Sequence, residues 1–140
     1  MPKIPPIELL TNGYAYGSPE EVAVTVGGTV KKNLLDEKYV DYKETCAIRV
    51  SHALNQSGEA IPWAGGNIDN PYRPGTKVRT DKGKNGKYYI YSTRDMRAYL
   101  NTRFGHPKKF PPGEATRDKI KNLKGIIAFG FLHIDIWNGA

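Results

Sequence analysis

Cys46 is the only cysteine in the chain, and it stands where the sequence predicts the start of a helix. Apolar or small side chains recur at Cys46, Val50, Ala53 and Leu54, which places them on one face of a 3.6-residue period. Thr45 is the expected N-cap, because its hydroxyl can accept a hydrogen bond from an early backbone N–H. A thiol at a helix start is expected to ionise more easily to the nucleophilic thiolate. A free cysteine is equally compatible with a small buried hydrophobe.

A cysteine nucleophile needs a base, and the three histidines differ in how well they could serve. His52 lies on the same predicted helix, about 240° round from Cys46, so it should face away. His106 stands in a basic loop and is expected to be solvated. His133 belongs to a predicted strand with alternating polarity, and we expect it to act as general base and acid. Asp135 is its possible orienter, although side chains at i and i+2 of a strand point in parallel and rarely hydrogen-bond well.

The elements that would position these groups begin with helices. Ser18 followed by Pro19 is typical of a helix start. The β-branched run Val22–Val26 that follows is equally typical of a strand, so the type of this element stays open. Further helices are expected from Cys46 to about Gln56 with Gly58 as the stop, from Ser92 to a closing Gly105, and over 118–124.

Two apolar runs near the C-terminus predict a strand pair. Ile126–Phe131 is continuously apolar, as expected of a strand buried on both faces, whereas His133–Trp137 alternates. Gly130 favours a tight turn and antiparallel pairing between them. Asn85-Gly86 predicts a hairpin tip that leads into a strand at Tyr88–Tyr91. The sequence therefore predicts an α+β fold in which a cysteine-bearing helix packs on a small, mostly antiparallel sheet, the layout of the papain-like superfamily.

Length and composition fit one soluble domain over 1–140. Of the 140 residues, 39% are apolar, and the 15 Gly and 10 Pro argue against an all-helical bundle. A single cysteine excludes an intramolecular disulfide and a multi-cysteine zinc site, and no cofactor is expected. The chain has no apolar run long enough to span a membrane, and residues 1–6 lack the apolar core of a secretory signal. We therefore expect synthesis in the cytoplasm and export only by machinery that reads no such signal.

The chain is basic, with 21 Lys and Arg against 14 Asp and Glu, a net charge of +7 and a pI near 9.5. A basic surface favours anionic partners, including nucleic acid, lipid headgroups and acidic cell-wall polymers. The charge does not choose among these partners, and solvated lysines alone explain it equally well.

Five ordered segments carry more specific motifs. They are Val26–Asn33 with Gly-Gly-x-Val-x-x-Asn, Cys46–Asn55 near Cys-x-Ile-Arg-Met-Ser-x-x-Leu-Asn, Tyr88–Leu100 with Tyr-Ile-Tyr-x-x-x-Asp-Met-x-x-Tyr-Leu, Lys124–Ile127, and His133–Gly139 near His-x-x-Leu-Trp-Asn-Gly. Together these segments resemble the fourth family of type VI secretion amidase effectors, which are papain-like cell-wall peptidases.

The resemblance implies an antibacterial toxin that hydrolyses peptidoglycan stem peptides, at the γ-D-glutamyl–diaminopimelate bond. It implies Cys46 as nucleophile and His133 as general base and acid. It also implies delivery into the periplasm of a target bacterium and a cognate immunity protein as partner. Nucleic acid and membrane are not expected partners, and the oligomeric state stays open.

Two departures from the family pattern leave alternatives open. The loop over residues 128–132 is shorter than the family's, and the family's third catalytic residue, an Asp beyond Asn-Gly, would lie past Ala140. Asp135 could substitute, the enzyme could use a dyad, or the chain could be truncated. A weakened papain-like domain that binds cell wall or a partner protein is therefore the main alternative. A single-stranded nucleic-acid binder that uses the tyrosines of Tyr88–Tyr91 is a third.

Overall fold

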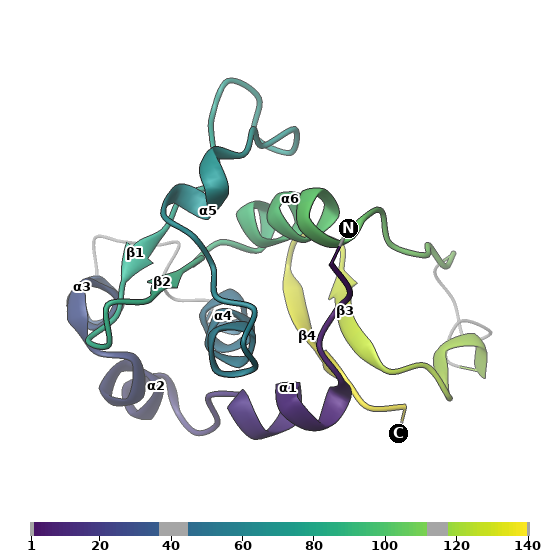
Figure 1. The fold of residues 1–140 in the computed structure, drawn as a ribbon, viewed down its shortest axis with the longest axis horizontal. Helices are drawn as coiled ribbons and strands as arrows, with labels where there is room; N and C mark the ends of the chain where they lie inside the picture. The colour runs from purple at the N-terminus through teal and green to yellow at the C-terminus, as the bar shows by residue number, and fades with distance from the viewer. Residues whose placement is uncertain (1, 37–44, 112–117, 140) are drawn as a thin grey trace.

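The structure is a computed structural model that describes residues 2–36, 45–111 and 118–139. Figure 1 shows the order of its elements. The helices are α1 (Ile7–Gly13), α2 (Pro19–Val26), α3 (Gly28–Leu34), α4 (Cys46–Gln56), α5 (Ala64–Asn67) and α6 (Thr93–Phe104). The strands are β1 (Asp81–Lys82), β2 (Tyr88–Tyr89), β3 (Gly125–Phe129) and β4 (His133–Trp137). No helix in the described ranges has the length and apolar character needed to cross a bilayer.

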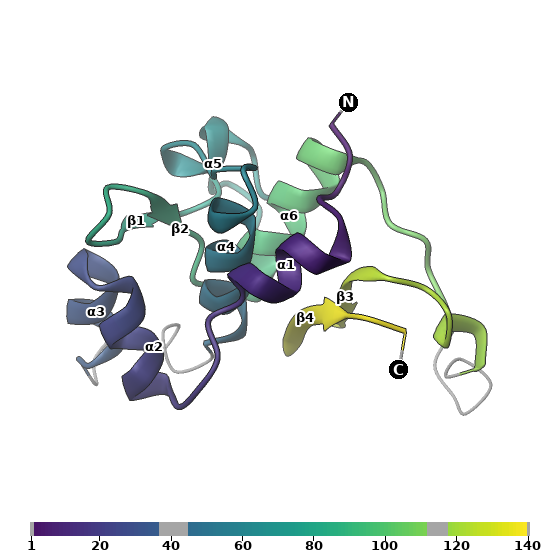
Figure 2. The same cartoon turned by 60° about the horizontal axis from the view of Figure 1, so that its bottom comes forward.

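Helix α4 is the centre of the molecule, with α1, α6, β2 and β4 all packed against it. The two views in Figures 1 and 2 place it between the β1–β2 hairpin and the β3–β4 pair. Its buried residues include Cys46, Ile48, Val50 and Leu54, and they join two clusters of the core. The predicted bounds of α4 are confirmed, because the helix ends at Gln56.

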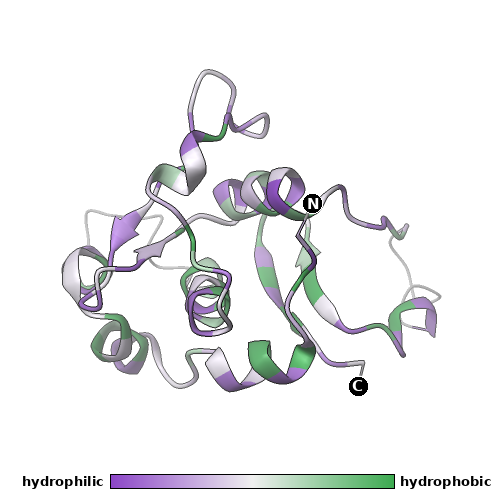
Figure 3. Ribbon diagram, in the orientation of Figure 1, coloured by the Kyte–Doolittle hydropathy of each residue, from purple (hydrophilic) through white to green (hydrophobic). Residues whose placement is uncertain are grey.

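The run Val22–Val26, whose type the sequence left open, belongs to helix α2, and the capping residues at the start of the helix explain why. The Ser18 hydroxyl accepts from the Glu21 N–H, and the Glu21 carboxylate accepts from the Ser18 N–H, which forms a complete capping box. The buried face of α2 holds Val22 and Val26, four residues apart, as a helical period requires. Figure 3 shows hydrophobic colouring along α1 and α2, which includes the buried Leu10, Val22 and Val26 as well as the exposed Leu9 and Val24.

Helix α6 begins and ends where the sequence predicts. The Ser92 hydroxyl accepts from the Asp95 N–H at the N-cap, and Gly105 ends the helix with a φ of 94°. Near the C-terminus, residues 118–120 form a helical turn, but 121–124 form a turn and irregular chain, so the helix expected over 118–124 is shorter than predicted.

Strands β3 and β4 form the predicted antiparallel pair, with Phe129 opposite His133 and Gly125 opposite Trp137. Gly130 has a φ of +60° at the turn between them. The expectation that the first run is buried on both faces is wrong. In the described part of the chain β3 pairs only with β4, and one face of this ribbon packs on the helices, so Phe129 is 52% exposed.

The Asn85-Gly86 tip is confirmed as the turn of a small hairpin. Strand β1 pairs antiparallel with β2, and Lys82 lies opposite Tyr88. The strand predicted over Tyr88–Tyr91 is shorter than expected and ends at Tyr89. The next residue, Ile90, instead hydrogen-bonds the Ser51 hydroxyl of α4 through its N–H and its carbonyl.

Candidate active site

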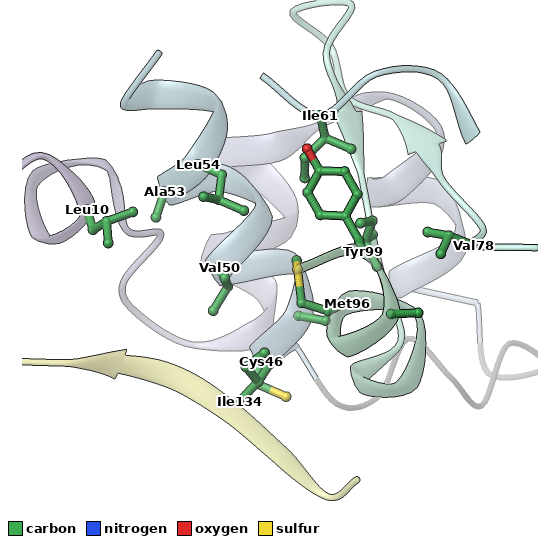
Figure 4. Close-up of a cluster of buried hydrophobic side chains, with 13 residues drawn as sticks. Leu10, Cys46, Val50, Ala53, Leu54, Ile61, Val78, Met96, Tyr99 and Ile134 are labelled. Carbon is green, nitrogen blue, oxygen red and sulfur yellow. The ribbon is translucent and has the colours of Figure 1, made fainter. Parts of the chain in front are cut away.

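Cys46 is the first residue of α4, as predicted, and its side chain is only 6% exposed. Figure 4 shows it at the end of a buried cluster, beside Ile134 of β4. Its sulfur lies 3.4 Å from the Thr93 hydroxyl of α6, and either atom can be the donor. The candidate nucleophile therefore lies where three elements meet.

The start of α4 is held by Arg49 rather than by a side-chain cap. Thr45 precedes the helix, but its hydroxyl caps no backbone N–H, so the predicted capping role is wrong. Instead the Thr45 hydroxyl accepts from Arg49 Nε at 2.9 Å. Arg49 Nη1 also donates to the Ala15 carbonyl at 3.0 Å, which ties the segment after α1 to this end of the helix.

His133 opens β4 and stands beside Asp135. Its Nε2 lies 3.3 Å from Asp135 Oδ2, and both side chains are close to half exposed. The imidazole also stacks on Phe129 across the strand pair, with ring centroids 6.0 Å apart. The general expectation that residues at i and i+2 of a strand do not pair therefore fails here. The two side chains share one face of β4, and both are partly exposed.

The elements that carry Cys46 and His133 pack together, but the sulfur and the imidazole are not hydrogen-bonded to each other. Ile134 is fully buried against the same cluster as Cys46, and α4 packs on β4. Neighbouring strand residues point to opposite faces, so His133 does not share the fully buried side of β4 that Ile134 occupies. In the described part of the chain the polar partner of the sulfur is Thr93, and that of the imidazole is Asp135.

Tyr14 is a further polar group at this end of α4. Burial raises the pKa of its hydroxyl above the ordinary value of 10.0, and the Asp135 carboxylate and Cys46 raise it further. The Arg49 guanidinium acts in the opposite direction. Tyr14, Arg49, Cys46 and Asp135 thus influence one another electrostatically, although they come from three separate parts of the sequence.

The other two histidines lie outside this group. His52 Nδ1 is 2.7 Å from the Tyr89 hydroxyl, and burial, followed by the Lys87 charge, lowers the pKa of His52 below 6.5. It therefore links α4 to β2, as a structural residue does. His106 lies in an exposed loop, as predicted.

Sequence reasoning missed three residues that the structure places near the site or in its support. Thr93 and Tyr14 contact or influence Cys46, and Asp95 is a buried anchor of α6. Only Asp95 belonged to a recognised motif, and the motif gave no role for it. Among the described residues, no group of three or more His, Cys, Asp or Glu could hold a metal ion.

Two hollows lie on the surface away from the sulfur. One of about 520 Å³ is lined by the loop residues 69–71 and 74–77. The other, of about 270 Å³, lies between α1 and α4 and is lined by Leu9, Asn12, Gly13, Tyr14, His52 and Gln56. Of the residues near Cys46, the second hollow is lined by Tyr14.

Comparison with known proteins gives both a family and a fold. The family described as type VI secretion system (T6SS) amidase effector protein 4, or Tae4, matches residues 42–140. No curated protein matches the chain.

Solved structures of Tae4 effectors share the fold. The effector from Enterobacter cloacae aligns with a TM-score of 0.73 and 24% identity, over 99% of this chain and 85% of that chain. The effector from Salmonella typhimurium, in complex with the immunity protein Tai4 from Enterobacter cloacae, aligns with a TM-score of 0.72 and 24% identity, over 97% and 82%.

The predicted α+β, papain-like fold, with the cysteine-bearing helix packed on a small antiparallel sheet, is confirmed by these structures and by the observed elements. The family match extends from residue 42 to residue 140 and so includes Cys46, His133 and Asp135. The chain therefore belongs to the type VI secretion amidase effector 4 family.

Proposed function

We propose that residues 1–140 form a single cysteine amidase domain that hydrolyses the γ-D-glutamyl–diaminopimelate bond of peptidoglycan stem peptides. As a member of its family the protein is a peptidoglycan-cleaving amidase effector and an antibacterial toxin. The bond and the cysteine mechanism are the proposed parts. The observation that carries them is the only cysteine of the chain at the first residue of α4, with β4 passing across it and beginning at His133.

The proposed reaction has two halves. His133 takes the proton of the Cys46 thiol, and the sulfur attacks the carbonyl carbon of the scissile amide. The backbone N–H of Cys46, at the start of α4, donates to the oxyanion that forms. His133 then gives its proton to the leaving amine as the C–N bond breaks. In the second half His133 activates a water, which hydrolyses the thioester and regenerates the thiol.

This mechanism requires the His133 ring to leave its stack on Phe129 and turn toward the sulfur. Such a rotation is feasible because the side chain is half exposed and stands at the end of the strand ladder. Exposed side chains change rotamer in picoseconds to nanoseconds, and catalytic contacts often tighten only when substrate binds. Asp135, which lies beside the ring, is proposed as the orienting carboxylate.

The net charge of +7 favours a substrate with free carboxylates, such as a stem peptide. The similar effectors from Salmonella and Enterobacter were solved with the immunity protein Tai4. We accordingly propose a cognate immunity protein as the partner of this chain and the periplasm of a target bacterium as its place of action.

The test is to incubate purified sacculi with the wild-type protein and with the C46A variant, and to analyse the released muropeptides by mass. We expect wild type to convert stems to products cut between D-glutamate and diaminopimelate, and C46A to yield none. Circular dichroism of both proteins checks that the substitution leaves the fold intact. Equal activity of the two proteins would contradict cysteine catalysis, and products cut elsewhere would contradict the proposed bond.

A weakened domain that binds cell wall without cutting it is the second candidate. The burial of Cys46 and the pairing of the His133 ring with Asp135 rather than with the sulfur favour this alternative. Sedimentation of wild type with sacculi, without any change in muropeptide masses, is the result that it predicts.

A further inference from the structure

Thr93 provides the one side-chain hydrogen bond that the described structure gives to the candidate nucleophile. Its Oγ1 lies 3.4 Å from Cys46 Sγ, within hydrogen-bond range for sulfur, and the contact is buried. The buried cluster that contains Cys46 is otherwise apolar and includes Val50, Met96 and Ile134, with the Tyr14 hydroxyl close enough to interact with Cys46 electrostatically. Thr93 itself is 7% exposed, so water does not readily replace its hydroxyl.

The position of the Thr93 hydroxyl is fixed by local structure. Thr93 is the first residue of α6, and the preceding Ser92 caps that helix through its own hydroxyl. The hydroxyl of a threonine in a helix interior commonly donates a hydrogen bond to the carbonyl four residues earlier. At the first helical position no helical carbonyl lies behind it, so the hydroxyl can point outward to Cys46. The branched Cβ also limits the rotamers that Thr93 can adopt.

This contact matters because the mechanism needs an ionised sulfur in a dry, apolar place. Apolar surroundings disfavour a thiolate, and a buried charge is costly unless it is hydrogen-bonded. A hydroxyl suits both states of the cysteine, since it can accept from the S–H and donate to the S⁻. The Thr93 hydroxyl therefore offsets part of the cost of ionisation without hindering the protonated state.

We propose that Thr93 is a positioning residue that holds the Cys46 sulfur and stabilises its thiolate form. This inference rests on the proposed function. The titratable and charged groups that interact with one another at this end of α4 are Cys46 itself, Tyr14 after α1, Arg49 on α4 and Asp135 on β4. They stay in place when only the hydroxyl of residue 93 is removed.

The test uses the T93V and T93S variants and measures how fast iodoacetamide alkylates the protein at neutral pH. Because the chain has one cysteine, the rate reports Cys46 alone. Loss of one hydrogen bond to a charged group predicts an alkylation rate about tenfold lower in T93V. T93S keeps the hydroxyl and is expected to restore most of the rate. T25V is the matched control, since that hydroxyl donates to the Glu21 carbonyl within α2.

Turnover of sacculi by the same variants gives the second readout. T93V is expected to lower kcat by about the same factor as it lowers the alkylation rate, and to leave KM near the wild-type value. T93S is expected to recover most of kcat. The inference would be overturned if folded T93V were alkylated at the wild-type rate. It would also be overturned if T93V and T93S lost the alkylation rate equally. If wild type itself fails to cut sacculi while T93V still slows alkylation, the role of Thr93 stands and the proposed function falls.

Discussion

At the scale of single residues, two charged groups near Cys46, Arg49 and Asp135, each make two contacts that fix the direction of the side chain. Arg49 holds both the Thr45 hydroxyl and the Ala15 carbonyl. Asp135 accepts from the Ile136 N–H at 2.8 Å through Oδ1, which leaves Oδ2 to face His133. A carboxylate restrained in this way can orient an imidazole better than a freely rotating one, because less rotamer entropy is lost.

The proposed roles of His133 and Asp135 predict unequal losses of activity. A general base and acid is typically worth about 10²- to 10⁴-fold, so H133A should lower kcat on sacculi by that factor. D135N keeps the shape of the side chain but loses its charge, and we expect a smaller loss, of about tenfold. Both side chains are about half exposed, so thermal unfolding of the variants should stay near wild type.

A larger effect of D135N than of H133A would contradict this order. The matched control is D69N, because Asp69 is exposed and forms its ion pair with Lys77 in the loop before β1. It should leave kcat unchanged. A double variant of His133 and Asp135 that is no worse than H133A alone would support action of the carboxylate through the imidazole.

At the scale of elements, the helix ends could be predicted from single residues, whereas the sheet environment could not. Ser18, Ser92 and Gly105 each have a local role that the sequence states directly. Helix α3 was missed because it begins at a Gly-Gly pair, in which Gly27 and Gly28 have φ values of 66° and 62°, and such a pair is typical of a chain break. The exposure of β3 depends on how many strands pair with it, and an apolar run carries no such information.

The sequence also placed Cys46 at a helix start and His133 and Asp135 on one strand face. It could not give the direction of the His133 ring relative to α4. That direction depends on which face of the β3–β4 ribbon packs on the helices, and Ile134 takes the buried side. The predicted capping role of Thr45 was also wrong, because its hydroxyl instead accepts from Arg49, a partner that comes within reach only once the helix has formed.

The contact between α4 and β2 predicts a pH dependence of stability. Burial lowers the pKa of His52 below its ordinary 6.5 in the folded protein, whereas unfolding restores that value. The unfolded chain therefore binds the proton first, and stability should fall as the pH decreases below about 6.5. The H52Q variant, which cannot gain this charge, should show a smaller loss. Urea unfolding of both proteins between pH 7 and about pH 5 measures the difference.

H106Q, in an exposed loop, is the control for the loss of a histidine as such. The hydroxyl of Tyr89 lies 2.7 Å from His52, so Y89F separates the hydrogen bond from the titration. It should weaken the fold at both pH values. If H52Q and wild type lose equal stability on acidification, His52 is not the group responsible.

At the scale of the whole molecule, the motif residues serve two purposes. Most of them build the core around α4: Ile48, Tyr89, Ile90, Met96 and Tyr99 are all buried. The proposed catalytic residues, Cys46 and His133, lie on α4 and β4, which pack together. A family pattern identifies both kinds of residue without separating them, and burial in the structure separates them.

Asp95 shows how the fold secures α6, and thereby Thr93, from a distance. Its buried carboxylate accepts from Arg73 Nη2 and Arg79 Nε, each at 2.8 Å, and from the Asn70 amide. These partners all belong to the loop that precedes β1, so one side chain joins that loop to the first turn of α6. Removal of one member of a buried ion pair leaves the partner charges uncompensated.

We therefore expect D95N to lower the free energy of unfolding by about 3 kcal/mol, near the lower end for a buried pair because both arginines keep some contact with solvent. D69N removes an exposed pair of the same loop, and it should cost less than about 1 kcal/mol. Urea unfolding of the two variants makes the comparison directly. Because α6 begins at Thr93, D95N should also slow alkylation of Cys46 at temperatures where the protein stays folded. Equal stability of D95N and D69N would mean that the loop and α6 are held together by packing rather than by this carboxylate.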